Sequence, residues 1–272
     1  MWKRRDEQRA GERMSAQRAS IVTGAASGIG RAAALALAAQ GDAVLVADVD
    51  GPGAERTAGE IEEAGGRALA RAVDVASSAD CEAAVAAATA LGELRALVNV
   101  AGIAVAPDSV EHVSDADLER LLAVNLGSVF RLARHAIPLL RAAGGGTIVN
   151  TASVHAYATM TDNAAYAASK GALVALTRQM ALDLAPDGIR AVCVAPGSVD
   201  TPLTRRELER RGLSAAEAGF DDSDVAGRGT AIGRIAAPQE IADVIAWLTT
   251  PAAAVVNGTT VVADAGLLAR LV

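Results

Sequence analysis

Short apolar runs alternate with longer stretches of helical pattern along most of the chain. The runs are rich in valine and isoleucine and are mostly apolar throughout, which is typical of parallel strands buried on both faces. They predict strands at Ser20–Thr23, Ala43–Asp48, Arg67–Val73, Ala96–Asn99, Thr147–Ala152, Arg190–Ala195 and Thr259–Ala263.

The intervening stretches predict helices, and glycines such as Gly41 and Gly65 mark helix ends. Asp115 and Asp117 lie in the expected first turn of the fourth helix. Strands that alternate with helices indicate an α/β domain, in which a doubly wound parallel sheet of about seven strands carries helices on both faces. The helices are expected near 28–40, 51–65, 77–91, 114–143, 164–185 and 238–249.

Two segments depart from this alternation. Residues 1–18 are strongly charged and lack the apolar stretch of a secretory signal, so we interpret them as a mobile basic extension of a domain covering 19–272. Met14 is an alternative start. Residues 201–232 are long, charged and interrupted by glycines. A long irregular insertion in a compact domain is usually a functional lid or a disordered loop, and we predict a substrate lid.

Composition excludes several classes of function. The net charge is −7 and aromatic residues make up 2% of the chain, so no basic surface with interleaved aromatic residues is expected to bind nucleic acid. No apolar run is long enough to span a membrane, and the three histidines show no metal-ligand spacing. The two cysteines, Cys81 and Cys193, form no disulfide framework, which favours a reducing, cytoplasmic location.

The first predicted strand runs into the sequence TGAASGIG, residues 23–30, just before a predicted helix. Gly24, Gly28 and Gly30 permit a tight turn and a close approach of the backbone to a pyrophosphate, and the helix offers its N-terminus. The spacing GxxxGxG is a variant of the usual dinucleotide turn. Its position between a strand and a helix indicates a dinucleotide site.

Asp48 ends the second predicted strand, 18 residues after Gly30. A carboxylate there can accept hydrogen bonds from the ribose hydroxyls of adenosine and would repel a 2′-phosphate. No Arg or Lys lies in the glycine turn or just after Asp48, so the sequence predicts NAD rather than NADP as the cofactor. Asp74, just past the third strand, could reach the adenine edge or could cap the next helix.

Tyr166 and Lys170 stand four positions apart in an alanine-rich predicted helix, and the chain has just two tyrosines. Residues at i and i+4 share one helix face. An ammonium group beside a phenol favours the phenolate and lowers its pKa, which makes the tyrosine a usable proton donor or acceptor. Alone, the pair could equally be a core tyrosine beside a surface lysine.

Several further motifs occur in a fixed order. Together with the glycine turn and the tyrosine–lysine pair, they resemble those of the short-chain dehydrogenase/reductase family, from about residue 19 to 266. The motifs are TGAASGIG (23–30), DV (74–75), NVAG (99–102), the asparagine of VNLG (124–127), Ser153, YAASK (166–170) and PGSVDT (196–201).

The resemblance implies a single Rossmann-type domain with the catalytic residues Asn125, Ser153, Tyr166 and Lys170. Tyr166 would take the proton of a secondary alcohol as its hydride moves to NAD, and Ser153 would hydrogen-bond the substrate oxygen. Lys170 would favour the phenolate and hold the nicotinamide ribose. Asn125 would anchor a water that relays the proton, or would instead be a helix-kink residue satisfied by backbone.

The resemblance also implies which residues line the cofactor. Thr201 and the backbone of Val199 would contact the nicotinamide carboxamide, and Gly197 would let the chain pass close to the ring. The residues expected to bind NAD are Thr23, Gly24, Ser27, Gly28, Ile29, Gly30, Asp48, Asp74, Val75, Asn99, Ala101, Gly102, Tyr166, Lys170, Pro196, Gly197, Val199 and Thr201.

The chain departs from common family motifs in NVAG, in Ala152–Ser153 and in Asp264–Ala265–Gly266, none of which touches the catalytic residues. The substrate pocket is expected to use 103–105, 154–163 and 201–232, with His155 and Tyr157 as candidate contacts. His155 could equally be a histidine at the pocket rim.

The predicted activity is NAD-dependent oxidation of a secondary alcohol or reduction of a ketone. Two alternatives are a dehydratase or epimerase with bound NAD and a non-catalytic NAD-binding protein. The resemblance implies a homotetramer, or a dimer, built through the helices at 114–143 and 164–185.

Overall fold

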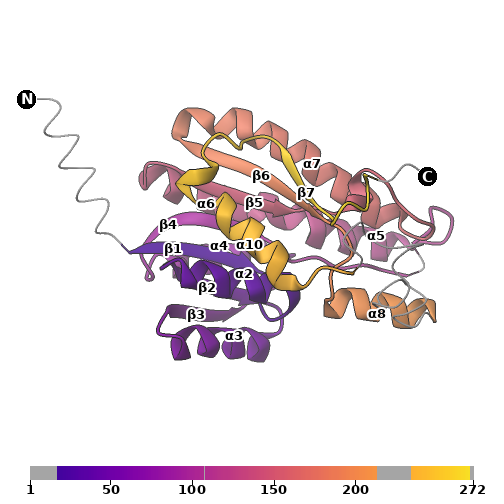
Figure 1. Cartoon of the computed structure of the whole chain (residues 1–272), viewed down its shortest axis with the longest axis horizontal. Coiled ribbons are helices and arrows are strands. Elements are labelled where there is room, and N and C mark those ends of the chain that lie inside the picture. Colours follow the sequence, from indigo (N-terminus) through magenta and orange to yellow (C-terminus); the bar gives the residue numbers. More distant parts are fainter. Residues whose placement is uncertain (1–16, 107, 213–233, 270–272) are drawn as a thin grey trace, which may run out of the picture.

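The computed structural model describes residues 17–106, 108–212 and 234–269. One parallel sheet of seven strands forms its centre, in the order β3-β2-β1-β4-β5-β6-β7 (Figure 1). This arrangement confirms the predicted doubly wound α/β fold. The strands are β1 (Arg18–Thr23), β2 (Ala43–Asp48), β3 (Arg67–Ala72), β4 (Glu93–Asn99), β5 (Gly146–Thr151), β6 (Ile189–Pro196) and β7 (Thr260–Ala263).

Helices cover both faces of the sheet and enclose two apolar cores. One core contains residues of α2 (Gly28–Ala39), α3 (Gly51–Glu63) and α10 (Pro238–Leu248). The other contains residues of α4 (Ser78–Ala88), α6 (Ser128–Ala142) and α7 (Ala164–Leu184). α5 (Asp115–Leu122) contacts α7.

Side chains of the central strands alternate between these two cores. In β1, Ile21 lies in the core under α4, α6 and α7, and Val22 lies in the core under α2, α3 and α10. Both side chains are fully buried. A strand whose two faces are both buried must be apolar at successive positions, which explains why the strands appear in the sequence as nearly uninterrupted apolar runs.

The helix expected at 114–143 is divided in the structure. A π-helical turn, Ala123–Gly127, separates α5 from α6 and contains Asn125. A π turn adds one residue to a helical turn and is frequent at functional sites. The apolar spacing continues across this turn, so the pattern of the sequence does not reveal it.

The segment predicted to be an irregular lid begins instead with a helix, α8 (Pro202–Arg211), beyond the carboxyl edge of the sheet (Figure 1). Thr201 is its N-cap, and the Thr201 hydroxyl accepts a hydrogen bond from the backbone N–H of Thr204 at 3.2 Å. Residues 213–232 of the predicted lid lie outside the described residues.

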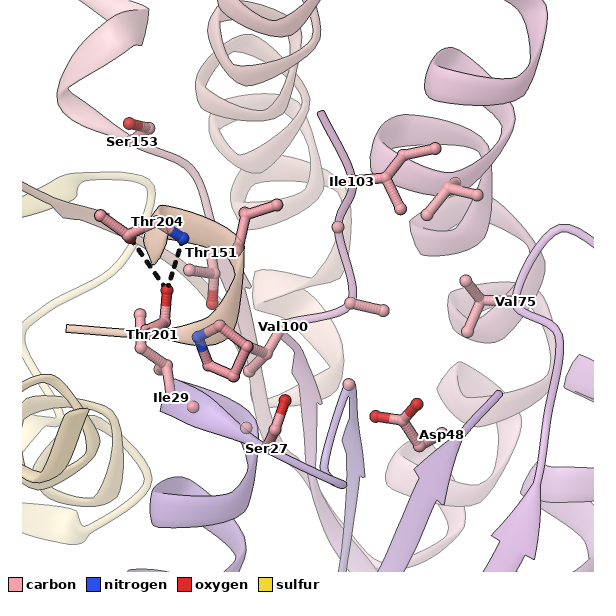
Figure 2. Close-up of a pocket in the computed structure, with 18 of the residues that line it drawn as sticks. Ser27, Ile29, Asp48, Val75, Val100, Ile103, Thr151, Ser153, Thr201 and Thr204 are labelled. Atoms are coloured by element: carbon pink, nitrogen blue, oxygen red, sulfur yellow. Dashed lines mark hydrogen bonds between the residues drawn. The ribbon is translucent and has the colours of Figure 1, made fainter. Parts of the chain in front are cut away.

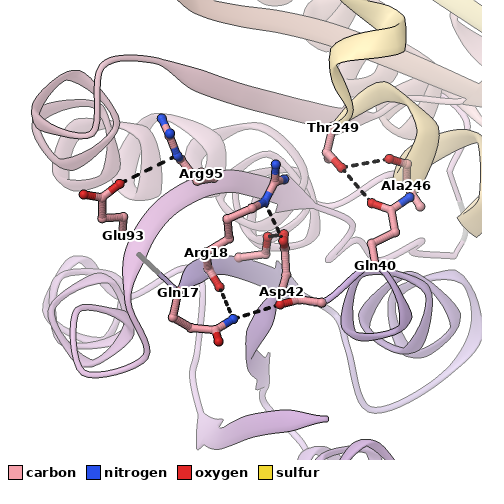
Figure 3. Close-up of polar contacts among 10 residues, drawn as sticks. Gln17, Arg18, Gln40, Asp42, Glu93, Arg95, Ala246 and Thr249 are labelled. Atoms are coloured by element: carbon pink, nitrogen blue, oxygen red, sulfur yellow. Dashed lines mark hydrogen bonds and ion pairs between the residues drawn. The ribbon is translucent and has the colours of Figure 1, made fainter. Parts of the chain in front are cut away.

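The amino edge of the sheet includes two residues that we had assigned to the extension. Arg18 begins β1, and its Nε lies 2.7 Å from Oδ1 of the buried Asp42 (Figure 3). The Gln17 amide donates to the carbonyl of Gly41 at 2.8 Å. The ordered domain therefore begins before residue 19, because these polar side chains satisfy groups at the start of β2.

Candidate active site

The candidate site lies where the order of strands reverses, between β1 and β4. Ligands of doubly wound sheets bind at this point, beyond the carboxyl ends of the strands. Gly24, directly after β1, has φ +66°, and a Cβ placed there would lie 2.9 Å from the backbone of Ala101, which follows β4. Thr23 ties the two segments together, because its hydroxyl accepts hydrogen bonds from the N–H groups of Val100 and Ala101 at 3.1 and 3.2 Å.

The glycine turn leads into a helix whose N-terminus is open. Ser27 is the N-cap of α2, but within the described chain no side-chain hydrogen bond caps this helix and its first turn holds no acidic residue. By contrast, side chains of Asp50, Ser77 and Ser114 cap α3, α4 and α5. Free N–H groups at a helix N-terminus favour an anion such as a pyrophosphate. The turn therefore fits a dinucleotide.

Asp48 lies at the end of β2, as predicted, and also supports the turn. Its Oδ2 accepts a hydrogen bond from the N–H of Ala26 at 2.9 Å, and its Oδ1 accepts one from the N–H of Asp50 at 3.0 Å. Each carboxylate oxygen keeps a second lone pair. The side chain can therefore still accept hydrogen bonds from ribose hydroxyls.

A cavity of about 460 Å³ runs from this turn to the catalytic residues. Figure 2 shows Asp48 toward one end of it and Ser153 toward the other. The cavity brings together most of the predicted cofactor residues: Gly24, Ser27, Gly28, Ile29, Gly30, Asp48, Asp74, Val75, Ala101, Gly102, Tyr166, Lys170, Pro196, Gly197, Val199 and Thr201.

Two predicted cofactor residues, Thr23 and Asn99, do not line this cavity and lie behind its wall. The Asn99 amide donates to Oδ1 of Asn150 at 2.9 Å, and the Asn150 amide donates to Thr177 at 3.0 Å. These buried bonds join β4, β5 and α7. Thr23 and Asn99 thus fix the strand ends that form the wall, rather than lining the cavity themselves.

Asp74 and Gly197 also have structural partners within the fold. The carboxylate of Asp74 accepts a hydrogen bond from the N–H of Ala76 at 2.9 Å, so it holds the turn before α4 while Ser77 caps the helix. A Cβ on Gly197 would lie 2.9 Å from the Cα of Asp264. Gly197 therefore also permits close packing of the chain after β7.

Three of the predicted catalytic residues meet at the end of this cavity. Ser153 and Tyr166 both line the cavity there, and hydrogen bonding by the Ser153 side chain favours the Tyr166 phenolate. The Nζ atom of Lys170 lies 5.5 Å from the centre of the Tyr166 ring and donates to the carbonyl of Thr151 at 2.8 Å. The arrangement places a hydroxyl donor, a phenol and an amine around one point, which suits proton transfer to or from a bound oxygen.

The pKa of Tyr166 moves opposite to the predicted direction. Burial raises it, because desolvation disfavours the phenolate, while the hydrogen bond from Ser153 lowers it. Burial also lowers the pKa of Lys170 to about 8. The prediction of a lowered pKa considered the charge of Lys170 and omitted the cost of burying both groups.

Burial of Lys170 makes stability depend on pH. Its folded-state pKa of about 8 lies below the roughly 10.4 of a solvated lysine, so between these values the unfolded chain binds the additional proton. Stability should therefore rise with pH across this window. Relative to Lys170→Met, the wild type should gain on the order of 3 kcal/mol of unfolding free energy from pH 8 to pH 10.5.

Denaturant unfolding of both proteins across this range measures the difference. The comparison cancels the effect of the buried thiol of Cys81, whose raised pKa causes stability to fall as pH rises. Cys193 interacts with Lys170, so both proteins carry Cys193→Ala. Parallel stability curves for the two proteins would contradict the pKa shift of Lys170.

Asn125, the fourth predicted catalytic residue, lies behind the cavity wall and is 1% exposed. Its Oδ1 accepts from the N–H of Ile103 at 2.8 Å, and its Nδ2 donates to the Ile103 carbonyl at 3.0 Å and to Ser169 at 3.1 Å. Both amide hydrogens are therefore used. These bonds match the alternative role, in which Asn125 lies at an irregular helical turn and its side chain is satisfied by the backbone. Its Oδ1 keeps one further lone pair.

A second cavity, of about 500 Å³, adjoins the first. Ser153 and Tyr166 line both cavities. His155, in the short helix Val154–Ala156, lines the second cavity and contacts the edge of the Tyr166 ring at a centroid distance of 5.6 Å. Tyr157 is 51% exposed and lines neither cavity, so the structure does not bring it to the site.

Sequence reasoning did not single out several residues that line the cavities. Arg120 of α5 lines the first cavity, as does Arg206, which the sequence analysis placed only within the predicted lid. The second cavity is lined by two leucines that follow β7, and nothing in their sequence context marks them as a site. These additional residues are Arg120, Arg206, Leu267 and Leu268.

Within residues 17–106, 108–212 and 234–269 no helix is long and apolar enough to cross a membrane. No group of three or more His, Cys, Asp or Glu side chains in those ranges could hold a metal ion.

Known proteins resemble this chain over most of its length. A family model described as enoyl-(acyl carrier protein) reductase matches residues 24–268. The cyclohexanol dehydrogenase of Acinetobacter sp. (strain SE19) is 36% identical over 90% of this chain and 92% of its own length. The cis-4-hydroxycyclohexanecarboxylate dehydrogenase of Sinomonas cyclohexanicum is 38% identical over 93% of this chain and 98% of its own.

A solved structure resembles the whole fold. It is a 7α-hydroxysteroid dehydrogenase complexed with NADH and 7-oxo glycochenodeoxycholic acid, with a TM-score of 0.81 and 31% identity. The match covers 92% of this chain and 93% of that protein. Nearly the complete chain is therefore shared with these relatives.

Proposed function

The chain belongs to the short-chain dehydrogenase/reductase family and is an NAD-dependent oxidoreductase of secondary alcohols, and we propose that its substrates are neutral, largely hydrocarbon ring alcohols. One observation carries the proposal. Ser153 and Tyr166 lie at the boundary between the two cavities, so an alcohol in the second cavity would present its hydroxyl to both side chains next to the cofactor.

The lining of the second cavity supports the substrate class. Within the described residues no Lys or Arg lines it, and its acidic member, Glu207, forms an ion pair with Arg210. An apolar wall favours hydrocarbon, and a nearby carboxylate disfavours an anionic substrate. Eight of the 17 lining residues are apolar: Ala104, Val154, Ala158, Met160, Leu203, Leu208, Leu267 and Leu268.

The proposed chemistry assigns roles to three residues. NAD bound in the first cavity supplies the hydride acceptor. Tyr166, as phenolate, takes the hydroxyl proton, and Ser153 donates a hydrogen bond to the substrate oxygen. Lys170 stabilises the phenolate by its charge and is held in place by the Thr151 carbonyl. In the reductive direction Tyr166 returns the proton.

A substrate panel tests this function. NADH formation should be fastest, by kcat/KM, with cyclohexanol and its alkyl derivatives, and slower with cis-4-hydroxycyclohexanecarboxylate and with polyols. Glu207→Gln should raise the relative rate with the carboxylate. Preference for the carboxylate or for a polyol in the wild type would contradict the proposed substrate class. NADH consumption with an enoyl thioester alone would contradict the alcohol reaction.

Cofactor selectivity provides a further prediction. Asp48→Asn removes the negative charge and retains one of the two acceptor oxygens that support the glycine turn. The preference for NAD over NADP should narrow by about tenfold, equivalent to about 1.4 kcal/mol. Asp50→Asn, two residues away at the cap of α3, is the matched control because Asn also caps helices. Equal NAD preference in the wild type and Asp48→Asn would contradict the ribose assignment.

Two exposed apolar areas support the proposed homotetramer. Phe130 of α6 is 52% exposed and Leu182 of α7 is 74% exposed. On the sheet edge formed by β7, Val262 is 44% exposed, and Trp247 of α10 is 41% exposed. Two separate self-complementary faces would generate a tetramer with three twofold axes. Light scattering tests this assembly, and a monomeric mass would contradict it.

A cytoplasmic location is also proposed. Both cysteines are buried thiols rather than a disulfide, which suits a reducing compartment. Fractionation of the source cells tests the location.

A further inference from the structure

Asp108 is a buried carboxylate outside the four predicted catalytic residues. It lies in the segment between β4 and α5 and is 2% exposed. Its Oδ1 accepts a hydrogen bond from the N–H of Ala165 at 2.7 Å, and its Oδ2 accepts one from the N–H of Tyr166 at 3.1 Å. Its own carbonyl accepts from the N–H of Ala164 at 2.7 Å. One residue thus binds the first three N–H groups of α7.

We propose that Asp108 is a positioning residue for the dehydrogenase reaction, because it fixes the first turn of α7 and thereby places the phenol of Tyr166. This role rests on the proposed function of Tyr166. A carboxylate at a helix N-terminus satisfies the orphan N–H groups and the positive end of the helix dipole.

The helix has no other cap within the described chain. Asn163 is the N-cap, but its amide donates to the carbonyl of Thr161 at 3.0 Å and caps nothing. The first hydrogen bond within the helix runs from the N–H of Ala167 to the carbonyl of Asn163. Tyr166 is the third residue of α7, so its backbone N–H depends on Asp108 for a partner.

The reactive groups around the Tyr166 phenol are anchored outside α7, although Lys170 itself lies one turn further along that helix. Lys170 is tied to the carbonyl of Thr151 at the end of β5. Ser153 caps the short helix Val154–Ala156 through the N–H of His155. Neither attachment involves Asp108. Loss of Asp108 should therefore displace Tyr166 relative to Ser153 and Lys170, and displacements of about 1 Å can cost on the order of a hundredfold in rate.

The segment between β4 and α5, which carries Asp108, also links the cofactor cavity to α7. The chain that carries Asp108 leaves β4 through Ala101, Gly102 and Ile103, and all three line the cofactor cavity. Asn125 holds Ile103 by two hydrogen bonds and contacts Ser169 of α7. The segment after β4 is therefore attached to α7 both at Asp108 and at Ser169.

Three variants of the full-length protein test the proposal. Asp108→Ala removes both carboxylate bonds, and Asp108→Asn retains one amide oxygen as acceptor. Ser114→Ala is the matched control, because it removes the cap of α5, where the Ser114 hydroxyl accepts from the N–H of Asp117 at 3.1 Å. A general loss of helix capping affects all three variants, whereas misplacement of Tyr166 affects the Asp108 variants alone.

Kinetics give the first readout. Asp108→Ala should lower kcat by roughly ten- to a hundredfold while the Kd for NADH stays within about threefold, and Asp108→Asn should lose less. Ser114→Ala should keep kcat within about twofold. A kcat for Asp108→Ala within twofold of wild type, or an equal loss of NADH affinity, would overturn the proposal. If the alanine variant does not fold, Asp108→Asn decides by the same criteria.

A spectroscopic readout does not depend on turnover. The chain contains two tyrosines, so tyrosine labelled with ¹³C at Cζ gives two resonances, and Tyr157→Phe assigns that of Tyr166. Asp108→Ala should shift or split the Tyr166 resonance, and Ser114→Ala should leave it in place. An unchanged Tyr166 resonance would overturn the role of Asp108. Failure of the wild type to oxidise any alcohol would count against the proposed function. The Tyr166 resonance would still decide whether Asp108 positions the phenol.

Discussion

Tyr166→Phe is expected to lower kcat by about 10²–10⁴-fold, the usual contribution of general acid–base catalysis. The substitution removes the phenol oxygen that exchanges the proton and that receives the hydrogen bond from Ser153. The Kd for NADH should change little, because the glycine turn, the open N-terminus of α2 and Asp48 are all retained. Steady-state turnover and fluorescence titration with NADH measure the two effects separately.

Tyr157→Phe is the matched control for this variant. Tyr157 lies close by in the chain but is exposed and lines neither cavity. The Tyr157→Phe variant should retain the wild-type kcat. Wild-type turnover in Tyr166→Phe would refute the proton-transfer role, and loss of NADH affinity without loss of kcat would reassign Tyr166 to cofactor binding.

Gly30→Ala is expected to weaken NADH binding by at least tenfold, or about 1.4 kcal/mol. A Cβ at Gly30 would overlap the backbone carbonyl of Gly24, which cannot move without opening the turn. Overpacking of this kind also costs about 1–3 kcal/mol of stability. Fluorescence titration with NADH and denaturant unfolding measure both losses.

Gly59→Ala provides the matched control, since Gly59 lies inside α3 and a Cβ there meets no atom of the structure within 4 Å. Alanine is preferred to glycine in a helix by about 1 kcal/mol, so this variant should be slightly more stable and should bind NADH normally. Normal NADH binding by Gly30→Ala would mean that the pyrophosphate does not lie against this turn.

The sequence predicted the central strands well because the environment of each is uniform. Ile21 and Val22 face different cores, and both cores require an apolar side chain. The π turn at 123–127 was concealed for a different reason, because Leu122, Leu126 and Val129 continue the helical spacing of apolar residues across it. α8 was missed for the opposite reason: its sequence PLTRRELERR has no apolar stripe.

Within the site, motifs with fixed spacing could be predicted and contacts between distant segments could not. The glycine turn and the pair Tyr166 and Lys170 each lie within one element and its flanks. Asp108 is 57 positions before Ala165, and an isolated aspartate in a loop gives no indication of its partner. Leu267 and Leu268 reach the second cavity only because the chain turns back after β7.

The π turn acts as a local insertion in a continuous helix. It takes up one extra residue within a single turn, so α5 and α6 keep nearly the relative rotation of one regular helix. Removing one residue from Ala123–Gly127 would therefore leave an ordinary α-turn and would keep Arg120 on the cavity wall and the apolar face of α6 on the sheet. The effect of shortening the chain here would fall on Asn125, which lies in the turn and bonds Ile103, rather than on the packing of either helix.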